Sequence, residues 1–268
     1  MSILNKYVLI TGASSGIGAA FASHAAAAGF DIGLCARRKD RLFELAEHLR
    51  KTYKVQADVY CIDLSAADAA LALNEQVRTM KRAVDVLINN AGFSIACGFA
   101  KSEYERQRAF LELTVHTPVA LSHMFLPHML KSGWGRIINI SSIAALSSGG
   151  KGHTLYPAGK AFLLKFSQSL ATEVSSRGVL VSAVLPGFVA TEFQQANEID
   201  AKSMQGAKWF TQTPEQMVQE AWRRNNQGAE IITPGLSAKI MAILLRYLPE
   251  KLVRALTRPL AARAYDDD

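Results

Sequence analysis

The chain has 268 residues, 49% of them hydrophobic, which is enough for one sizeable α/β domain with a large buried core. Its formal net charge of +7 comes from scattered Lys and Arg residues, and no nucleic-acid-binding motif is present, so we expect a solvated surface and no nucleic-acid partner. No stretch is apolar and uncharged over the length of a membrane span, and the N-terminal residues lack the layout of a signal peptide.

Short apolar runs alternate with helical patterns along the chain. In the first half we predict strands at residues 7–10, 31–36, 55–61, 85–88 and 136–140, and helices at 16–28, 38–51, 66–82 and 102–131. In the second half we predict a helix at 155–176, a strand at 179–185, an irregular stretch at 186–213, a helix from Pro214, a strand at 231–232, and helices at 236–247 and 250–262. This alternation indicates parallel strands joined by right-handed crossovers.

The cysteines are few and scattered. Cys35, Cys61 and Cys97 are odd in number and lack the spacing of metal ligands. This usage predicts reduced thiols, a cytoplasmic location and no metal site.

A glycine-rich segment lies between the first strand and the first helix. It reads Thr11-Gly12-Ala13-Ser14-Ser15-Gly16-Ile17-Gly18. Glycine allows the backbone to turn tightly and approach a pyrophosphate, and the N-terminus of the helix supplies free N–H groups and a positive dipole end. A strand before the glycines and a helix after them is the context that a dinucleotide site requires.

The second strand ends without the acidic residue that usually holds the ribose 2′-hydroxyl of NAD. Arg37 and Arg38 follow it instead. Two guanidinium groups suit a 2′-phosphate, with which they form charge-assisted hydrogen bonds, so this position predicts NADP. The alternative is a solvated helix start, which we consider weaker because cations are unfavourable at a helix N-terminus without an anion.

Tyr156 and Lys160 lie four residues apart at the start of a helix and therefore share one face. A free tyrosine has a pKa near ~10. A neighbouring ammonium group and a positive nicotinamide ring both favour tyrosinate, which suits Tyr156 to acid/base chemistry near neutral pH. The pair alone is a weak signal, because the same spacing occurs by chance on many helices.

The motifs gain specificity from their order. The glycine-rich segment, Asn89-Asn90-Ala91-Gly92, Ser141-Ser142, Tyr156-x-x-x-Lys160 and Pro186-Gly187 follow one another at suitable distances. This set resembles the short-chain dehydrogenase/reductase family over about residues 5–233. The resemblance implies a single doubly wound Rossmann-type domain with a mostly parallel sheet over residues 1–235. Residues 236–268 are then expected to form a helical extension packed on the same domain.

The resemblance also implies a role for each matching residue. The cofactor contacts are expected from Gly12, Ser14, Ser15, Gly16, Ile17, Gly18, Arg37, Arg38, Asp63, Leu64, Asn90, Ala91, Gly92, Tyr156, Lys160, Pro186, Gly187, Val189 and Thr191. Tyr156 is implied as the acid/base, Lys160 as the group that lowers its pKa and holds the nicotinamide ribose, and Ser142 as the residue that hydrogen-bonds the substrate oxygen. The interval between Ser142 and Tyr156 is one residue longer than usual, so we expect a small loop rearrangement, with Ser141 as the weaker substitute.

One position departs from the family pattern. Members usually carry an asparagine in the long central helix, where it holds a water that links the lysine to solvent, and the matching residue here is Thr114. Its hydroxyl either faces such a water or hydrogen-bonds the preceding helical turn. We expect His116 and His123 to be packed or surface residues, and Cys97, near the substrate mouth, to be a small buried side chain.

Together these features predict an NADPH-dependent oxidoreductase that reduces a ketone or aldehyde. Phe188, Phe193, Trp209 and Phe210 favour an apolar substrate. The alternatives are an NAD-linked alcohol or hydroxysteroid dehydrogenase and a catalytically weak NADP-binding regulatory protein. A homodimer or homotetramer is expected from the apolar helices around 102–130 and 155–176. The C-terminal helices mix apolar and basic residues, which favours packing over the substrate cleft or a neighbouring subunit above contact with a membrane.

Overall fold

The computed structural model describes residues 6–95, 97–149, 152, 154–193, 211–249 and 251–253. Their centre is a seven-stranded sheet with the strand order β3-β2-β1-β4-β5-β6-β7, in which every pairing is parallel. The strands are β1 Tyr7–Thr11, β2 Asp31–Ala36, β3 Ala57–Cys61, β4 Val84–Asn89, β5 Gly135–Ile140, β6 Val179–Val184 and β7 Ile231–Ile232. The order reverses between β1 and β4, which is where an open parallel sheet forms a crevice at its carboxyl edge.

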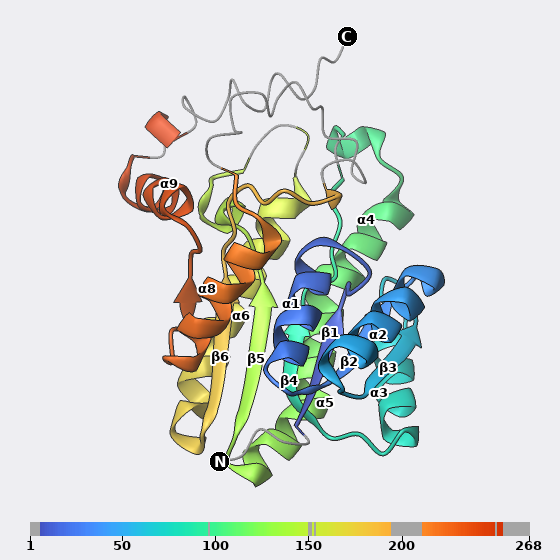
Figure 1. Ribbon diagram of the computed structural model, residues 1–268. Helices are drawn as coiled ribbons and strands as arrows, with labels where there is room; N and C mark the ends of the chain where they lie inside the picture. Colours follow the sequence, from blue (N-terminus) through green and yellow to red (C-terminus); the bar gives the residue numbers. More distant parts are fainter. Residues whose placement is uncertain are drawn as a thin grey trace.

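Helices cover both faces of the sheet (Figure 1). Contacts group α1, α2 and α8 on one face, and α3, α5 and α6 on the other, with α4 against α6. The helices are α1 Gly16–Ala27, α2 Lys39–Tyr53, α3 Ala69–Thr79, α4 Tyr104–Leu111, α5 Thr117–Ser132, α6 Leu155–Val174, α8 Pro214–Asn226 and α9 Leu236–Tyr247, with 3-10 turns η1 Phe99–Lys101, η3 Ile143–Leu146 and η4 Ser175–Arg177 and a π-helical turn η2 Glu112–His116.

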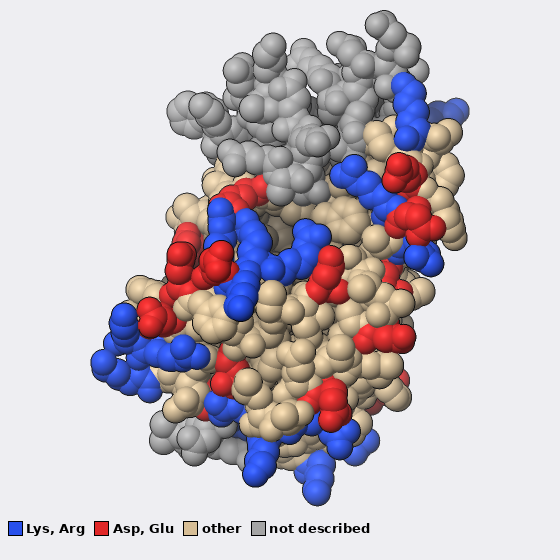
Figure 2. Space-filling view, turned by 90° about the vertical axis from the view of Figure 1, so that its right-hand side faces the viewer, with Lys and Arg blue, Asp and Glu red and all other residues tan. Residues whose placement is uncertain are grey.

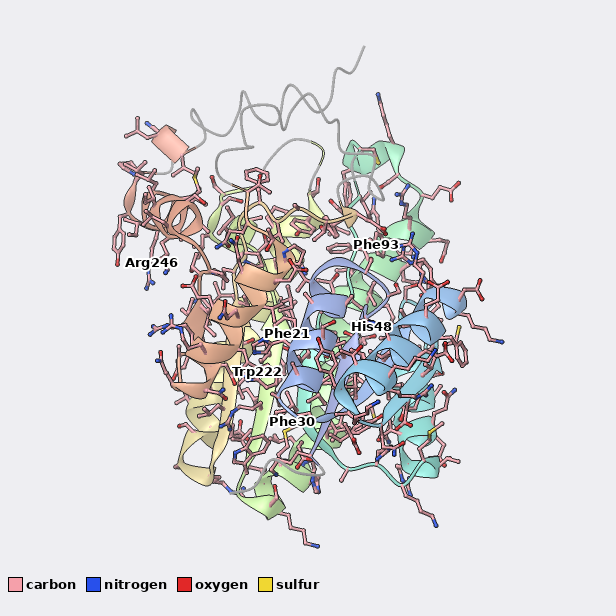
Figure 3. The ribbon with its side chains drawn as sticks, viewed as in Figure 1. Phe21, Phe30, His48, Phe93, Trp222 and Arg246 are labelled. Atoms are coloured by element: carbon pink, nitrogen blue, oxygen red, sulfur yellow. The ribbon has the colours of Figure 1, made fainter. Side chains whose placement is uncertain are left out.

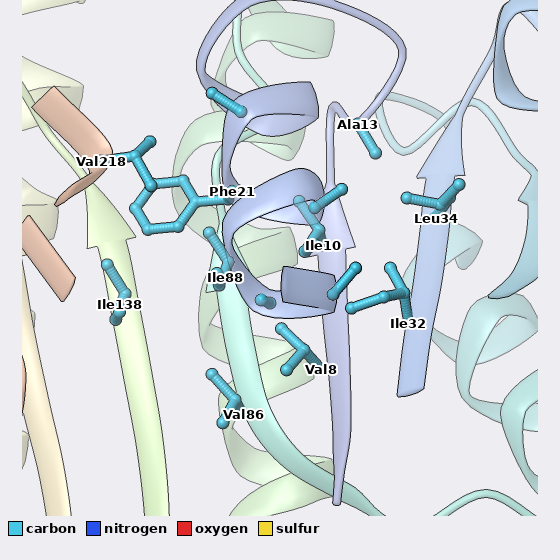
Figure 4. Packing of buried hydrophobic residues seen from close by; sticks show 14 of the residues in the cluster. Val8, Ile10, Ala13, Phe21, Ile32, Leu34, Val86, Ile88, Ile138 and Val218 are labelled. Carbon is cyan, nitrogen blue, oxygen red and sulfur yellow. The ribbon is translucent and has the colours of Figure 1, made fainter. Parts of the chain in front are cut away.

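The central strands are buried on both faces, which explains why they read as continuous apolar runs. In β1, Val8 and Ile10 face α1 and α8, whereas Tyr7 and Leu9 face the opposite helices. Figure 4 shows Phe21 of α1 reaching across the first of these cores toward α8. In the same layer, Phe30 and Trp222 meet edge to face with ring centroids 5.6 Å apart (Figure 3). The core thus fixes α1, and with it the turn that precedes it, on the sheet.

Most predicted elements are confirmed, and the differences have local causes. The strands at 31–36 and 231–232 and the helix at 236–247 have the predicted bounds. The strand predicted from Val55 begins at Ala57, because Lys54 ends α2 in a left-handed conformation with φ of 61°. The helix predicted at 66–82 begins at Ala69, after Asp68 with φ of 59°, and ends at Thr79.

The long helical region predicted at 102–131 is confirmed from Tyr104 to Ser132, but its hydrogen-bond pattern changes in the middle. It begins at Tyr104 as α4, passes through the π-helical turn η2, and resumes as α5. The predicted helix at 250–262 is described only at residues 251–253, which are helical, and its remainder lies outside the described residues.

Candidate active site

A cleft of about 490 Å³ lies at the carboxyl edge of the sheet. Its walls come from the segments that follow the first six strands, together with the first turns of α6. Figure 2 shows a hollow on one face of the molecule with basic side chains gathered beside it. Parallel strands bring these segments together because all their carboxyl ends meet at one edge.

The glycine-rich turn is packed so closely that its glycine positions have no room for a side chain. Gly12 has φ of +66°, and a Cβ there would lie 2.9 Å from Cα of Ala91. Gly18 does not line the cleft, but a Cβ on it would lie 2.2 Å from the carbonyl oxygen of Gly12. Gly18 therefore sets the close packing of α1 against the turn. The Ser15 side chain does not cap α1, which leaves the first N–H groups of this helix directed at the cleft.

Asn90 ties the end of β4 to the glycine-rich turn. Its Nδ2 donates to the carbonyl oxygens of Thr11 and Gly12 at 2.9 and 3.1 Å. The Thr11 hydroxyl in turn accepts hydrogen bonds from the backbone N–H groups of Asn90 and Ala91. This network holds the floor of the cleft between β1 and β4.

Three arginines lie near the start of α2, and two of them, Arg37 and Arg38, form the basic rim of the cleft. Arg37 lies 3.5 Å from a carboxylate oxygen of Asp63. Arg38 hydrogen-bonds Ser14 and Ser15 of the glycine-rich turn and, at 2.9 Å, the carboxylate of Glu192. Two Arg41 hydrogen bonds of 2.6 and 2.7 Å reach the same carboxylate. Figure 2 shows that acidic side chains lie among the basic ones on this face.

Hydrogen bonds from Arg41 and Arg38 lower the pKa of Glu192 to about 2. The pKa of Asp63 is also lowered, since hydrogen bonds from Ser65 and the charge of Arg37 outweigh its partial burial. Both carboxylates are therefore ionised at neutral pH, and each of them holds a cation beside the cleft.

Ser142, Tyr156 and Lys160 meet at the other end of the cleft. A hydrogen bond joins the side chains of Tyr156 and Ser142, so the longer sequence interval between them does not separate them. Nζ of Lys160 donates to the carbonyl oxygen of Ile140 at 2.9 Å and lies 5.7 Å from the centre of the Tyr156 ring. The Ser141 hydroxyl is already bound, because it donates to the carbonyl oxygen of Lys160 at 2.7 Å.

Burial shifts the pKa values of Lys160 and Tyr156 in the protein without a cofactor. Lys160 is 5% exposed, and desolvation lowers its pKa to about 8. Desolvation raises the pKa of Tyr156, and its hydrogen bond with Ser142 only partly offsets the rise. A positive charge placed beside the Tyr156 hydroxyl would act in the opposite direction and favour tyrosinate.

Thr114 lies in the π-helical turn behind the trio. Its methyl group packs against Gly159, where an added Cβ would lie only 3.0 Å away. The hydroxyl is buried and has no hydrogen-bond partner among the described residues. The alternative that it bonds the preceding helical turn is therefore wrong. An unpaired buried hydroxyl is the kind of group that an ordered water satisfies.

Aromatic rings form the wall beside Tyr156. Phe110 and Phe193 lie 6.4 and 6.2 Å from its ring centre, and Phe93, labelled in Figure 3, meets Phe110 edge to face. Trp209 and Phe210, which we expected to join this wall, lie outside the described residues. Cys97 is half-buried rather than fully buried as we expected.

The cleft brings together almost all the predicted site residues. Only Gly18 and Thr114 lie outside its lining. Sequence reasoning gave seven lining residues no place in the site: Cys35, Ala36, Ile62, Phe93, Leu113, Ile140 and Glu192. Most of them adjoin a recognised motif residue, which was the available signal, but Glu192 has no sequence signal for its contacts with α2.

Other candidate groups do not form sites. Among the described residues, no group of three or more His, Cys, Asp or Glu side chains is arranged to hold a metal ion, and no helix is long and apolar enough to cross a membrane. His116 and His123 are surface residues, and His116 hydrogen-bonds Glu112 at 2.9 Å.

Comparisons with known proteins agree with this geometry. The family model described as short chain dehydrogenase matches residues 6–202. A 3-oxoacyl-[acyl-carrier-protein] reductase of Aquifex aeolicus is 31% identical over 192 residues, which cover 72% of this chain and 77% of the relative. A short-chain dehydrogenase from Sphingobium yanoikuyae, solved in complex with NADPH, superposes with a TM-score of 0.79 and 32% identity over 89% of this chain and 92% of that one. A structure of a 7β-hydroxysteroid dehydrogenase superposes with a TM-score of 0.85 and 25% identity, over 95% of this chain and 97% of that one.

Proposed function

Because the chain belongs to the short-chain dehydrogenase family, we propose that it is an NADPH-dependent oxidoreductase that reduces a ketone or aldehyde to an alcohol. The observation that carries the proposal is the position of Ser142, Tyr156 and Lys160 at one end of the cleft, opposite the glycine-rich turn. Tyr156 is hydrogen-bonded to Ser142, and the buried Lys160 lies beside them. The turn suits a pyrophosphate, and the trio suits the transfer of a proton to a carbonyl oxygen.

The residues of the cleft fit a dinucleotide. A Cβ on Gly12 or Gly16 would lie 2.9 Å from Ala91 or 3.0 Å from Thr191, so glycine at these positions lets the turn pack closely against both walls of the cleft. The N-terminus of α1 and Ser14 would hold the pyrophosphate, and Asp63 and Leu64 would contact the adenine. Lys160 would hold the nicotinamide ribose, with Asn90 to Gly92 and Pro186, Gly187, Val189 and Thr191 along the remaining walls.

In the proposed mechanism, bound NADPH supplies the hydride that goes to the carbonyl carbon of the substrate. Ser142 holds the carbonyl oxygen, and the hydroxyl of Tyr156 donates the proton that converts this oxygen into an alcohol. Lys160 stabilises the tyrosinate that remains, through its positive charge. The buried hydroxyl of Thr114 would position a water that returns the proton to this end of the cleft.

The choice of NADPH rests on Arg37 and Arg38, since no acidic residue ends β2. The NADPH complex of the Sphingobium yanoikuyae relative supports the same choice. Fluorescence titration with NADPH and NADH tests it. Wild type should bind NADPH more tightly, and Arg37→Ala should cost on the order of 1.5–3 kcal/mol of that binding free energy, the worth of one charge-assisted hydrogen bond. Equal or tighter binding of NADH by wild type would defeat this assignment.

An apolar carbonyl compound is the proposed substrate, because Phe93 and Phe193 line the cleft and the Phe193 ring lies beside Tyr156. The test is NADPH oxidation across a panel of apolar ketones, aldehydes and oxoacyl compounds.

Similarity to a 7β-hydroxysteroid dehydrogenase favours a second candidate, the NAD-linked oxidation of a hydroxysteroid. This candidate predicts turnover with NAD and a steroid alcohol and no preference for NADPH.

We further propose that residues 1–235 form the catalytic domain and that 236–268 are an extension packed on it. Within the described residues, α9 contacts η3, and Lys239 of α9 pairs with Glu220 of α8 at 2.6 Å. A cytoplasmic location is proposed because Cys35, Cys61 and Cys97 are all free thiols. A homo-oligomer is the proposed assembly.

A further inference from the structure

A short segment after β6 lies along the mouth of the cleft, and we name residues 189–193 the strap. At its base, Val189 and Gln212 form a parallel bridge, and the N–H of Ala190 donates to the carbonyl oxygen of Gln212 at 2.9 Å. Near its end, Thr191 packs on the glycine-rich turn so closely that a Cβ on Gly16 would lie 3.0 Å from its methyl carbon. The strap therefore joins the two ends of the cleft.

Glu192 fastens the strap to α2. One carboxylate oxygen accepts from Arg38 at 2.9 Å, and both oxygens accept from Arg41 at 2.6 and 2.7 Å. The same Arg38 side chain hydrogen-bonds Ser14 and Ser15 of the glycine-rich turn. One guanidinium group thus connects the strap, α2 and the turn.

These contacts add a negative charge at the start of α2, where Asp40 is the acidic residue of the first turn. Arg38 is the N-cap residue of α2, and cations there are unfavourable without a nearby negative charge. In the protein alone Glu192 is the carboxylate that hydrogen-bonds Arg38. A dinucleotide carrying a 2′-phosphate would bring a second and larger negative charge to the same guanidinium group, because the phosphate would be held between Arg37 and Arg38.

The two rim arginines are not held equally. Arg37 lies 3.5 Å from Asp63, and 71% of its side chain is exposed. Arg38 makes shorter hydrogen bonds to three partners and is 44% exposed. Arg37 is consequently free to turn toward a phosphate, whereas Arg38 must give up or share Glu192 to do so.

We propose that Glu192 is a specificity-determining residue whose carboxylate competes with the cofactor's 2′-phosphate for Arg38. This inference rests on the proposed binding of a dinucleotide by Arg37 and Arg38. The competition weakens the binding of NADPH but not of NADH, so Glu192 reduces the preference for the phosphorylated cofactor. Displacement of the carboxylate also frees the strap, which leads into the substrate side of the cleft through Phe193.

Arg41 moderates this competition. It does not line the cleft, yet it contacts both oxygens of Glu192 and so neutralises much of the carboxylate charge. Removal of Arg41 leaves Arg38 as the one rim arginine that hydrogen-bonds Glu192 among the described residues. Arg41 thereby favours the 2′-phosphate without contacting it.

The test is a titration of wild type and Glu192→Gln with NADPH, NADH and two fragments, 2′,5′-ADP and 5′-AMP, which report on the 2′-phosphate without the nicotinamide. The neutral isostere Gln removes the charge and keeps the size of the side chain. Glu192→Gln should bind NADPH and 2′,5′-ADP about two- to fivefold more tightly, the effect expected of an exposed ion pair, and should bind NADH and 5′-AMP as wild type does. Glu47→Gln is the control, since Glu47 is an exposed carboxylate on α2 that pairs with Lys51 and does not line the cleft.

Arg41→Gln should weaken NADPH binding in wild type and weaken it less in Glu192→Gln, because the competitor is then absent. Looser binding of both dinucleotides by Glu192→Gln would show that Glu192 only braces the strap, and an unchanged ratio of affinities would show that its carboxylate does not compete. Either result overturns the inference. Wild type that binds neither dinucleotide, or prefers NADH, would instead reject the proposed function itself.

Discussion

Lys160 shows how one buried residue can serve several purposes. Its Nζ donates to the carbonyl oxygen of Ile140, and its own carbonyl oxygen accepts the Ser141 hydroxyl. These two bonds fix the ammonium group beside Tyr156 and also engage the serine that precedes Ser142. The Ser141 hydroxyl is thus bound to the backbone of α6, whereas that of Ser142 hydrogen-bonds Tyr156, which supports the proposed role of Ser142.

Tyr156→Phe should abolish nearly all turnover and keep cofactor affinity, because it removes only the proton donor. Lys160→Ala should reduce both turnover and cofactor affinity, since the lysine serves the nicotinamide ribose as well as the tyrosine. The measurements are steady-state rates with a carbonyl compound that wild type reduces, and fluorescence titration with NADPH. A Tyr156→Phe variant that retained a sizeable share of wild-type activity would show that another group donates the proton.

The lowered pKa of Lys160 predicts how stability depends on pH. In the unfolded chain its pKa is near ~10.4, and in the folded protein it is about 8. Between these values the unfolded state binds more protons, so the free energy of unfolding rises with pH across this window, and the penalty for burying the ammonium group is fully present below it. From pH 7.5 to 9.5, wild type should gain on the order of 2 kcal/mol relative to Lys160→Met.

Urea unfolding of the cofactor-free protein at both pH values measures this difference. The Met variant keeps an unbranched apolar stem and has no titrating group, so it subtracts the pH response of the rest of the molecule. Equal pH responses of the two proteins would mean that Lys160 titrates near its ordinary value despite its burial.

Among the helices and strands, the π-helical turn η2 is the element that could not be predicted from the sequence. Residues 102–131 carry a helical pattern throughout, and nothing in that pattern marks the extra residue of a π turn. The family resemblance did single out Thr114, and the turn spans Glu112–His116 around it. The unpaired hydroxyl required the structure, because whether Thr114 bonds the preceding turn depends on the local backbone.

Thr114→Val keeps the shape of the side chain and removes the hydroxyl, so it should slow turnover if that hydroxyl holds a water of the proton relay. Thr114→Asn, which restores the family's usual residue, should change the rate only modestly. Turnover in water and in heavy water distinguishes the roles, because a proton relay gives a solvent isotope effect that a packing role does not alter. Identical rates and isotope effects for wild type and Thr114→Val would show that the hydroxyl is structural.

At the scale of the whole molecule, the site was predictable wherever its residues follow strand ends. The motifs after β1, β4, β5 and β6 are far apart in sequence, and parallel pairing alone brings them to one edge of the sheet. Glu192 was not predictable in this way. Its contacts with Arg38 and Arg41 join residues 154 and 151 positions apart, and no periodicity or motif relates them. Glu192 reaches Arg38 and Arg41 because the strap crosses the cleft toward α2, and this path is known only from the structure.

Exposed apolar side chains are grouped on two parts of the described surface. Tyr104 and Leu111 of α4 and Phe162 of α6 are 73%, 38% and 40% exposed, and α4 packs against α6. The second part is α9, where Leu236, Ile240, Ile243, Leu244 and Tyr247 are exposed and Arg246 lies on the outer side (Figure 3). Clustered apolar groups of this kind are typical of surfaces that meet another molecule.

We expect self-association through the surface formed by α4 and α6. The stacked rings of Phe162 and Phe166, 6.1 Å apart, supply a rigid apolar contact that a twofold axis would repeat on both subunits. Phe162→Asp should therefore shift the protein to a smaller species in light scattering at micromolar concentration, because it places a charge in the buried centre of the interface. Phe43→Asp, at a ring with 46% exposure on α2, is the matched control and should leave the assembly intact.

Flotation with anionic vesicles distinguishes self-association from a membrane role for α9. Binding of α9 to the vesicles would make the protein float whatever residue occupies position 162. A wild-type monomer would reject the prediction.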